Sequence, residues 1–132
     1  MPKVVPELAG AEPGSEIARS TFPFSQVVEA NGFVFLAGQV GNVPGSDGPV
    51  PGGIEAETRQ MLENVGQLLA AVGLGYGDVV KATVYLRDFD DFPGMNRVYR
   101  TFFPSEPPTR ATVGVTSLVA DYRIEIEITA AR

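Results

Sequence analysis

Arg110 is the first side chain in this sequence whose type and position suggest chemistry. It follows a proline pair in 107-PPTRATVGV-115 and opens a run of residues that is otherwise typical of an apolar strand. Alternation along this strand and along 122-YRIEIEIT-129 predicts that Arg110, Thr112 and Glu125 share the sheet face that points away from the helices. A guanidinium group beside a carboxylate has two interpretations: a cross-strand ion pair, or a fork that binds a substrate carboxylate next to a catalytic Glu125. The pattern alone favours the ion pair, because such pairs are common.

Histidine and cysteine are both absent from the sequence. Their absence excludes a Ser-His-Asp triad, a thiolate nucleophile, disulfides and zinc sites built from cysteine or imidazole. The acidic cluster 88-DFDD-91 lacks the further ligands of an EF-hand loop, and capping of a following helix explains it better. We therefore expect neither a metal nor another cofactor. Any catalysis must use carboxylates, hydroxyl groups, arginine, lysine or the backbone.

Length and charge restrict the number of domains and the kinds of partner. The 132 residues predict one domain over 1–132, in which residues 1–22, rich in Pro, Gly and Ser, form an irregular lead-in. The formal charge is −6 and no basic run occurs, which argues against nucleic acid as a partner. No apolar run is long enough to span a bilayer, and the N-terminus lacks the apolar core of a signal peptide. We therefore expect a cytoplasmic protein with no membrane partner.

The first half of the chain predicts a hairpin and a helix. The dipeptide 31-NG-32 tolerates positive φ and predicts a tight turn between two antiparallel strands within 25–41. The Gly- and Pro-rich segment 41–53 predicts an exposed loop. Apolar residues at helical spacing then predict a helix over 54–72, which Gly73 is placed to close.

The second half predicts a strand over 79–88, an aromatic-rich helix that Asp90 or Asp91 can cap, and two final strands over 110–115 and 122–129. The apolar residues predicted to face the helices from these three strands are Val80, Ala82, Val84, Leu86, Ala111, Val113, Val115, Ile124, Ile126 and Ile128. The order ββαβαββ therefore predicts an α+β domain with both helices packed on one face of a mixed sheet.

The other face of the predicted sheet has no element left to cover it. Its residues form a mixed polar and aromatic set: Lys81, Thr83, Tyr85, Arg87, Thr112, Arg123, Glu125, Glu127 and Thr129. Such a face is either hydrated or pressed against another subunit, and its composition fits a closed homo-oligomer.

Four segments of the chain also occur, in this order, in one known family. They are 23-PFSQVVEANGFVFLAGQ-39, 81-KATVYLRDFDDFPGMNRVYRTFFP-104, 107-PPTRATVGV-115 and 124-IEIEITA-130. Together they resemble the RidA family, also called YjgF or endoribonuclease L-PSP. The resemblance implies a chorismate-mutase-like α+β subunit and a homotrimer whose sheets form a central barrel. It also implies ligand sites in the clefts between subunits.

The resemblance assigns roles to four positions. It implies that Arg110 holds the carboxylate of a 2-imino acid and that Glu125 positions the water that hydrolyses the imine to a 2-oxo acid and ammonia. Asn96 matches the asparagine on the family's second helix, and Gly38 matches the glycine whose backbone lines the pocket. A protonated imine is already electrophilic, so orientation by an arginine and a positioned water suffice without metal or histidine.

Three pocket positions depart from the deaminase pattern. Phe24 and Ala37 stand where those enzymes usually have a tyrosine and a serine, and Thr112 stands where they commonly have a cysteine. Two hydroxyl groups are therefore lost and one is gained. A site built around a hydroxyl group discriminates strongly among ligands, so these changes bear on the substrate as well as on the rate.

The resemblance implies an enamine/imine deaminase, a hydrolase similar to 2-iminobutanoate/2-iminopropanoate deaminase. Two alternatives stay open: a non-catalytic trimer that binds or senses small carboxylates through Arg110, and a catabolic deaminase of the aminoacrylate or aminomuconate type. Retention of Glu125 favours an enzyme, whereas the missing hydroxyl group at Phe24 favours one of the alternatives. The family's endoribonuclease name fits poorly with the acidic charge and the lack of imidazole.

Overall fold

A computed structural model of the chain describes residues 3–8 and 23–132. The predicted order ββαβαββ is confirmed, with one addition, the two-residue strand β3. The elements are β1 (Val27–Ala30), β2 (Phe33–Leu36), β3 (Gln39–Val40), α2 (Gly53–Ala71), β4 (Val79–Leu86), α3 (Phe92–Phe102), β5 (Thr109–Gly114) and β6 (Ile124–Ala131). Single-turn 3-10 helices η1 (Tyr76–Asp78), η2 (Phe89–Asp91) and η3 (Val119–Asp121) precede β4, α3 and β6.

The predicted lead-in lies largely outside the described residues. In the part that is described, Val4 exchanges two backbone hydrogen bonds of 2.8 Å with Glu29 of β1. No helix in the described ranges is both long enough and apolar enough to cross a membrane.

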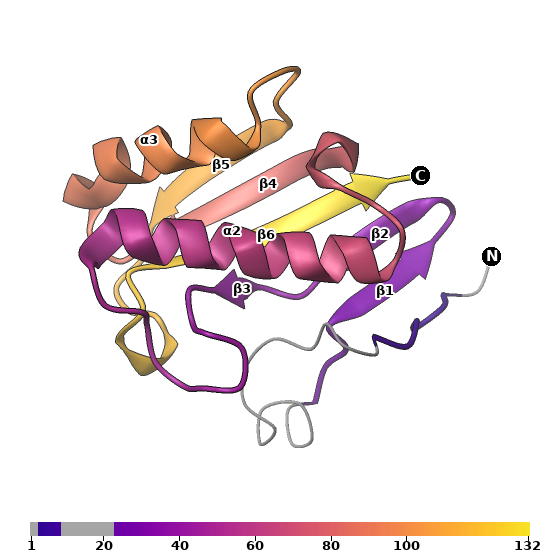
Figure 1. Cartoon of the computed structure of the whole chain (residues 1–132), viewed down its shortest axis with the longest axis horizontal. Helices are drawn as coiled ribbons and strands as arrows, with labels where there is room; N and C mark the ends of the chain where they lie inside the picture. The colour runs from indigo at the N-terminus through magenta and orange to yellow at the C-terminus, as the bar shows by residue number, and fades with distance from the viewer. Residues whose placement is uncertain (1–2, 9–22) are drawn as a thin grey trace.

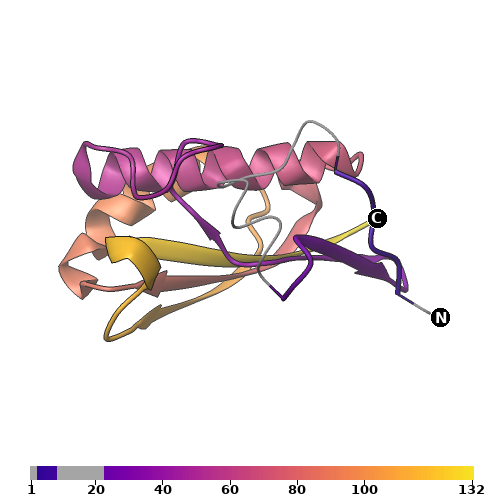
Figure 2. The same cartoon turned by 90° about the horizontal axis from the view of Figure 1, so that it is seen from below.

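The strands form one mixed sheet in the order β1-β2-β6-β4-β5, and β3 also pairs with β6. Among the strand pairs of the described residues, only β4–β5 is parallel. Helices α2 and α3 lie side by side on the same face of this sheet (Figures 1 and 2). The predicted architecture of two helices on one face of a mixed sheet is therefore confirmed.

The hairpin and the end of α2 follow from local sequence. Asn31 and Gly32 connect β1 to β2 with φ of 53° and 82°, the left-handed region that this turn requires. Gly73 ends α2 with φ of 79°, and its N–H donates to Ala70 O at 3.0 Å. The N–H of Leu74 reaches back to Leu69 O at 2.8 Å, which completes a Schellman-type C-terminus. Both turns were predicted and are confirmed.

The cap predicted for the second helix is wrong. Asp91 occupies the N-cap position of α3, but its side chain makes no capping hydrogen bond. It pairs instead with the guanidinium group of Arg123 at 3.1 Å. Asp88 provides a cap one turn earlier, at the start of η2. Its carboxylate accepts the N–H of Asp90 at 2.9 Å.

The core lies between the sheet and the two helices. Its largest fully buried side chains include Met61, Leu62, Leu68, Leu69, Leu86, Met95, Ile124, Ile126 and Ile128. Val80 was predicted to join them and is 43% exposed instead. The pairing of β4 with β6 shifts between Val79 and Lys81, and this bulge turns Val79 rather than Val80 into the core.

Candidate active site

Arg110 points toward the helices, contrary to the prediction. β5 pairs with β4 in a register that places Arg110 beside Ala82 and Thr112 beside Val84. Ala82 and Val84 are buried under the helices, and paired residues of neighbouring strands share a face. The prediction that Arg110 and Thr112 lie on the same face as Glu125 is therefore wrong.

The same register corrects the predicted apolar face of β5. Ala111 and Val113 were expected in the core, but both are exposed on the face away from the helices. The strand does alternate. Its more apolar set, with Ala111 and Val113, faces outward, and Arg110 and Thr112 face the helices.

The guanidinium group of Arg110 lies against aromatic rings of α3. Its Cζ is 4.7 Å from the centroid of the Tyr99 ring and 5.7 Å from that of Phe92, and Nη1 is 3.9 Å from Met95 Sδ. Cation–π contacts of this kind hold a guanidinium group without neutralising it. Within residues 3–8 and 23–132, no carboxylate forms an ion pair with Arg110. The interpretation as a cross-strand ion pair with Glu125 is wrong, and the donors of the arginine remain available to an anion.

Tyr99 has a hydroxyl group with an unusual setting. The side chain is 6% exposed, and its oxygen has no hydrogen-bond partner among the described residues. Burial raises the pKa of Tyr99, although the positive charge of Arg110 acts in the opposite direction.

Asn96 is half-buried on the same helix and follows Met95, which contacts the arginine. We call Arg110, Thr112 and Asn96 the arginine group.

Glu125 lies on the opposite face of the sheet. It is half-buried in β6 between Val40 of β3 and Tyr85 of β4. Burial is the main cause that raises the pKa of Glu125, and the neighbouring charge of Glu127 adds to it. A carboxylate with a raised pKa is a stronger base than an exposed one. Glu125 therefore has the environment of a general base.

Gly38 touches the Glu125 carboxylate. A Cβ atom built on Gly38 would lie 2.2 Å from Glu125 Oε2, so no other residue fits there without displacing the carboxylate. Gly38, which was predicted to line a site, is therefore in direct contact with Glu125.

Ala37 and Phe24 lie on the segments beside Gly38. The N–H of Ala37 donates to Gln26 O at 2.8 Å, and Gln39 Nε2 donates to Ala37 O at 2.9 Å. Gln39, which is 3% exposed, also reaches Gln26 Oε1 at 3.1 Å, so these hydrogen bonds fix the two segments against each other. Phe24 precedes Gln26 by two residues and is 52% exposed. We call Glu125, Gly38, Ala37 and Phe24 the glutamate group.

The two groups are separate within one chain. β4 lies between β5 and β6, so Arg110 and Glu125 are two strand spacings, roughly 10 Å, apart across the sheet. Arg110 pairs with Ala82 and Glu125 with Tyr85, three residues or roughly 10 Å further along β4. Their side chains also point to opposite faces. No small ligand can contact both side chains of the same chain.

Sequence reasoning missed three residues that shape these groups. Tyr99 was covered only by the prediction of an aromatic-rich helix, and Gln39 and Gln26 were not singled out. The sequence held no signal that pairs Tyr99 with Arg110, because alternation predicted Arg110 on the sheet face away from the helix that carries Tyr99 and Met95. Among residues 3–8 and 23–132, no three acidic, histidine or cysteine side chains are placed together to hold a metal ion.

Comparison with known proteins matches both the sequence and the fold. The Endoribonuclease L-PSP family profile matches residues 15–132. A RutC family protein of Pyrococcus horikoshii is 45% identical over 80% of this chain and 83% of its own. The human 2-iminobutanoate/2-iminopropanoate deaminase is 41% identical over 82% of this chain and 79% of its own. The crystal structure of the YjgF gene product of E. coli aligns with a TM-score of 0.78 and 37% identity, covering 86% of this chain and 91% of that one. The chain therefore belongs to the Endoribonuclease L-PSP family, the RidA/YjgF family that the sequence motifs resemble.

Proposed function

We propose that the protein is an enamine/imine deaminase that hydrolyses small 2-imino acids to 2-oxo acids and ammonia, in a site completed by two subunits. The observation that carries this proposal is the placement of Arg110 and Glu125 on opposite faces of one sheet. An anion-binding arginine and a base with a raised pKa are both present, but one chain does not bring them to one ligand. The relatives named as 2-iminobutanoate/2-iminopropanoate deaminases support the choice of reaction.

Arg110 binds and orients the substrate in this mechanism. Its planar group donates two parallel hydrogen bonds to the substrate carboxylate, and no protein carboxylate in the described ranges competes for them. The rings of Tyr99 and Phe92 keep the guanidinium group in place while the substrate carboxylate binds. The reacting imine carbon is thereby held at a fixed distance from the base of the adjacent subunit.

Glu125 activates the water. The water oxygen bonds to the protonated imine carbon while one of its protons passes to the Glu125 carboxylate, and the C=N bond becomes a C–N single bond. The carboxyl group then returns the proton to nitrogen. As the C–N bond breaks and ammonia leaves, the hydroxyl proton passes to the Glu125 carboxylate and the C=O bond of the 2-oxo acid forms; this proton then goes to ammonia, which departs as ammonium. Water is the only co-reactant, so the scheme uses the residues present here.

A closed homotrimer is the assembly that we propose. The sheet face away from the helices exposes apolar side chains, with Phe33 46%, Phe35 44% and Val113 39% exposed. Glu125 and Tyr85 share this face. Burial of such a face against a second copy, repeated around a threefold axis, would bring each glutamate group toward a neighbouring chain. A stable monomer at micromolar concentration in sedimentation would contradict this assembly.

The departures at Phe24, Ala37 and Thr112 favour a second candidate, a non-catalytic trimer that captures small carboxylates. Phe24 and Ala37 leave the glutamate group without the two expected hydroxyl groups, while the aromatic contacts that hold Arg110 are formed within one chain. The third candidate, a catabolic deaminase, differs only in substrate. The cytoplasmic location predicted from the sequence stays a prediction.

The deciding assay generates an imine in situ with an amino acid oxidase and follows its disappearance, or its trapped semicarbazone. Acceleration by wild type, and its loss in Glu125→Gln, supports the deaminase. If wild type binds pyruvate through Arg110 but accelerates hydrolysis of no small 2-imino acid, the binding protein is the correct function.

A further inference from the structure

We propose that Glu57 is a positioning residue for Glu125, whose buried carboxylate fixes the backbone at the start of β6. This inference rests on the proposed function, in which Glu125 holds the reacting water. An acidic residue near the N-terminus of α2, as Glu57 is, ordinarily only favours the positive end of the helix dipole. Its surroundings assign it a different task.

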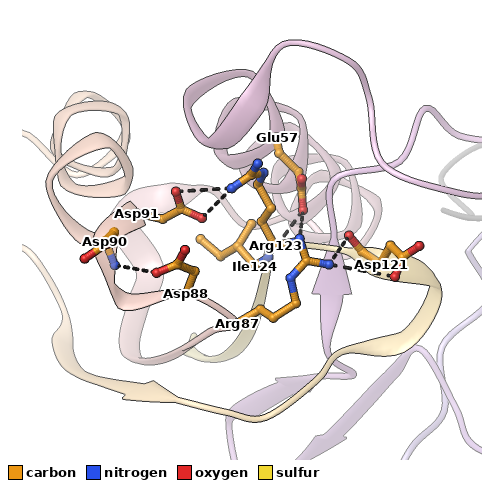
Figure 3. Close-up of polar contacts among 8 residues, drawn as sticks. All are labelled: Glu57, Arg87, Asp88, Asp90, Asp91, Asp121, Arg123 and Ile124. Carbon is orange, nitrogen blue, oxygen red and sulfur yellow. Dashed lines mark hydrogen bonds and ion pairs between the residues drawn. The ribbon is translucent and has the colours of Figure 1, made fainter.

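The Glu57 carboxylate binds the backbone beside Glu125. Glu57 lies on α2 and is 2% exposed. Its Oε2 accepts the N–H of Arg123 at 2.7 Å and the N–H of Ile124 at 3.3 Å (Figure 3). Ile124 is fully buried and is followed directly by Glu125. One oxygen atom therefore fixes the two peptide units that lead into the catalytic position.

The carboxylate replaces a missing strand partner. β3 contains only two residues, and its pairing with β6 ends at the Val40–Glu125 pair. The N–H groups of Arg123 and Ile124 consequently find their acceptor in a side chain from α2 instead of a neighbouring strand. A buried N–H group without an acceptor is costly, so removing Glu57 would force this end of β6 to move toward another acceptor or water.

Glu57 also contacts the segment that carries Gly38. A Cβ atom built on Gly41 would lie 2.4 Å from Glu57 O and 2.7 Å from Glu57 Cγ, so the end of β3 rests directly on this residue. Gly38, three residues earlier, touches the Glu125 carboxylate. Glu57 therefore contacts both chain segments beside Glu125, which are the start of β6 and the end of β3.

The charges around Glu57 show that its main contact is with the backbone. Arg123 already pairs with Asp91 at 3.1 Å, and Arg87 Nη1 donates to Asp121 O at 2.9 Å (Figure 3). Burial raises the pKa of Glu57, while the two N–H donors and the guanidinium groups of Arg123 and Arg87 act against this rise. No described arginine forms a direct ion pair with the Glu57 carboxylate.

The test compares Glu57→Ala and Glu57→Gln with a matched control, Asp91→Asn. The control removes an acidic charge that contacts the same Arg123, but leaves the backbone N–H groups bonded to Glu57. For each variant, kcat for imine hydrolysis, the Kd for pyruvate and the pH dependence of kcat are measured. We expect Glu57→Ala to lower kcat by roughly 10- to 100-fold, because a displaced catalytic group loses its near-attack geometry. Pyruvate binding through Arg110 should be unchanged.

The pH profile separates positioning from general loss of structure. In Glu57→Ala the start of β6 loosens and water reaches Glu125, which lowers the pKa of this carboxyl group. The acid limb of the pH profile of kcat should therefore move to lower pH in Glu57→Ala, and by less in Glu57→Gln. Asp91→Asn should leave both kcat and this limb in place. The proposal is overturned if Glu57→Ala weakens binding and turnover equally, or if Asp91→Asn reproduces its effects.

Two further outcomes are decisive. If Glu57→Ala fails to assemble, Glu57→Met decides alone, because it fills a similar volume but offers no acceptor oxygen to the two N–H groups; unchanged kcat and an unchanged pH profile in this variant would refute the positioning role of Glu57. If wild type hydrolyses no imine, the proposed function fails separately. NMR titration of the Glu125 carboxyl carbon then tests the positioning role of Glu57 directly: a lower pKa of Glu125 in Glu57→Met but not in Asp91→Asn supports it, and a pKa of Glu125 equal to that of wild type in Glu57→Met rejects it.

Discussion

The carboxylate of Glu125 occupies the space that a side chain at Gly38 would need, because a Cβ atom there would lie 2.2 Å from Oε2. Gly38→Ala should therefore displace the carboxylate and lower kcat for imine hydrolysis by roughly 10- to 100-fold, with little change in pyruvate binding. Gly77→Ala is the matched control, since a Cβ atom there meets nothing within 4 Å. Steady-state kinetics check the pair. Equal activity of Gly38→Ala and wild type would show that Glu125 need not stand where the structure places it.

The stacking of Arg110 on Tyr99 predicts an effect on ligand binding. Tyr99→Leu removes a ring 4.7 Å from Cζ. A cation–π contact of this kind is worth about 0.5–2 kcal/mol, which corresponds to a rise in Kd for pyruvate of roughly 2- to 30-fold. Tyr99→Phe keeps the ring and should bind almost as wild type does, because the hydroxyl group has no partner to lose within the described structure.

Phe103→Leu provides the control for the aromatic stack. Its ring lies 4.8 Å from that of Tyr99, and it is not among the rings that form a cation–π contact with Arg110 in the described part of the chain. This variant should lower stability without raising Kd, as isothermal titration calorimetry can show. A rise in Kd equal to that of Tyr99→Leu would mean that general loosening of α3, and not the cation–π contact, weakens binding.

Substitutions of Arg110 and of Glu125 should have different effects on ligand binding and on turnover. Arg110→Ala should abolish both, because charge-assisted hydrogen bonds to the substrate carboxylate contribute roughly 1.5–3 kcal/mol and, among the residues that the structure describes, no other cation stacks on the rings of Tyr99 and Phe92. Glu125→Gln keeps the shape but loses the base, so pyruvate should still bind while hydrolysis falls by roughly 10²-fold or more. Binding and turnover that both survive Arg110→Ala would remove the arginine from the site.

The raised pKa of Glu125 also affects stability. A carboxyl group whose pKa is higher in the folded state binds its proton more tightly there, so its contribution to stability falls as pH rises from its ordinary value of 4.5 through the folded pKa. Glu125→Gln lacks this loss. The free energy of unfolding of Glu125→Gln minus that of wild type should therefore increase across this window, as chemical denaturation at fixed protein concentration can measure. A difference that is flat or falls with pH would contradict the raised pKa.

Local chemistry made part of the fold predictable. The left-handed conformations at Asn31, Gly32 and Gly73 depend on the residues themselves, so the hairpin and the end of α2 could be predicted without knowing what they pack against. The family motifs likewise identified Gly38 and Glu125, and the structure places these two in contact.

The errors share one physical cause, which is contact between distant segments. The more apolar set of β5, with Ala111 and Val113, faces outward because the parallel pairing with β4 fixes which set is covered. Alternation alone divides the side chains of a strand into two sets but does not show which set the helices cover. The role of Glu57 was equally hidden, since its two N–H partners lie more than sixty residues away in the chain.

The most direct test of the shared site mixes two inactive variants. Subunits of Arg110→Ala and Glu125→Gln are unfolded together, refolded in equal amounts and assayed for imine hydrolysis. If each site takes Arg110 from one subunit and Glu125 from its neighbour, about a quarter of the sites in random trimers regain both groups, and activity should recover to about a quarter of wild type. Wild type mixed equally with the double variant should also give about a quarter by the same counting, whereas sites within one subunit would give about half. No recovery in the first mixture, together with half activity in the second, would contradict the account.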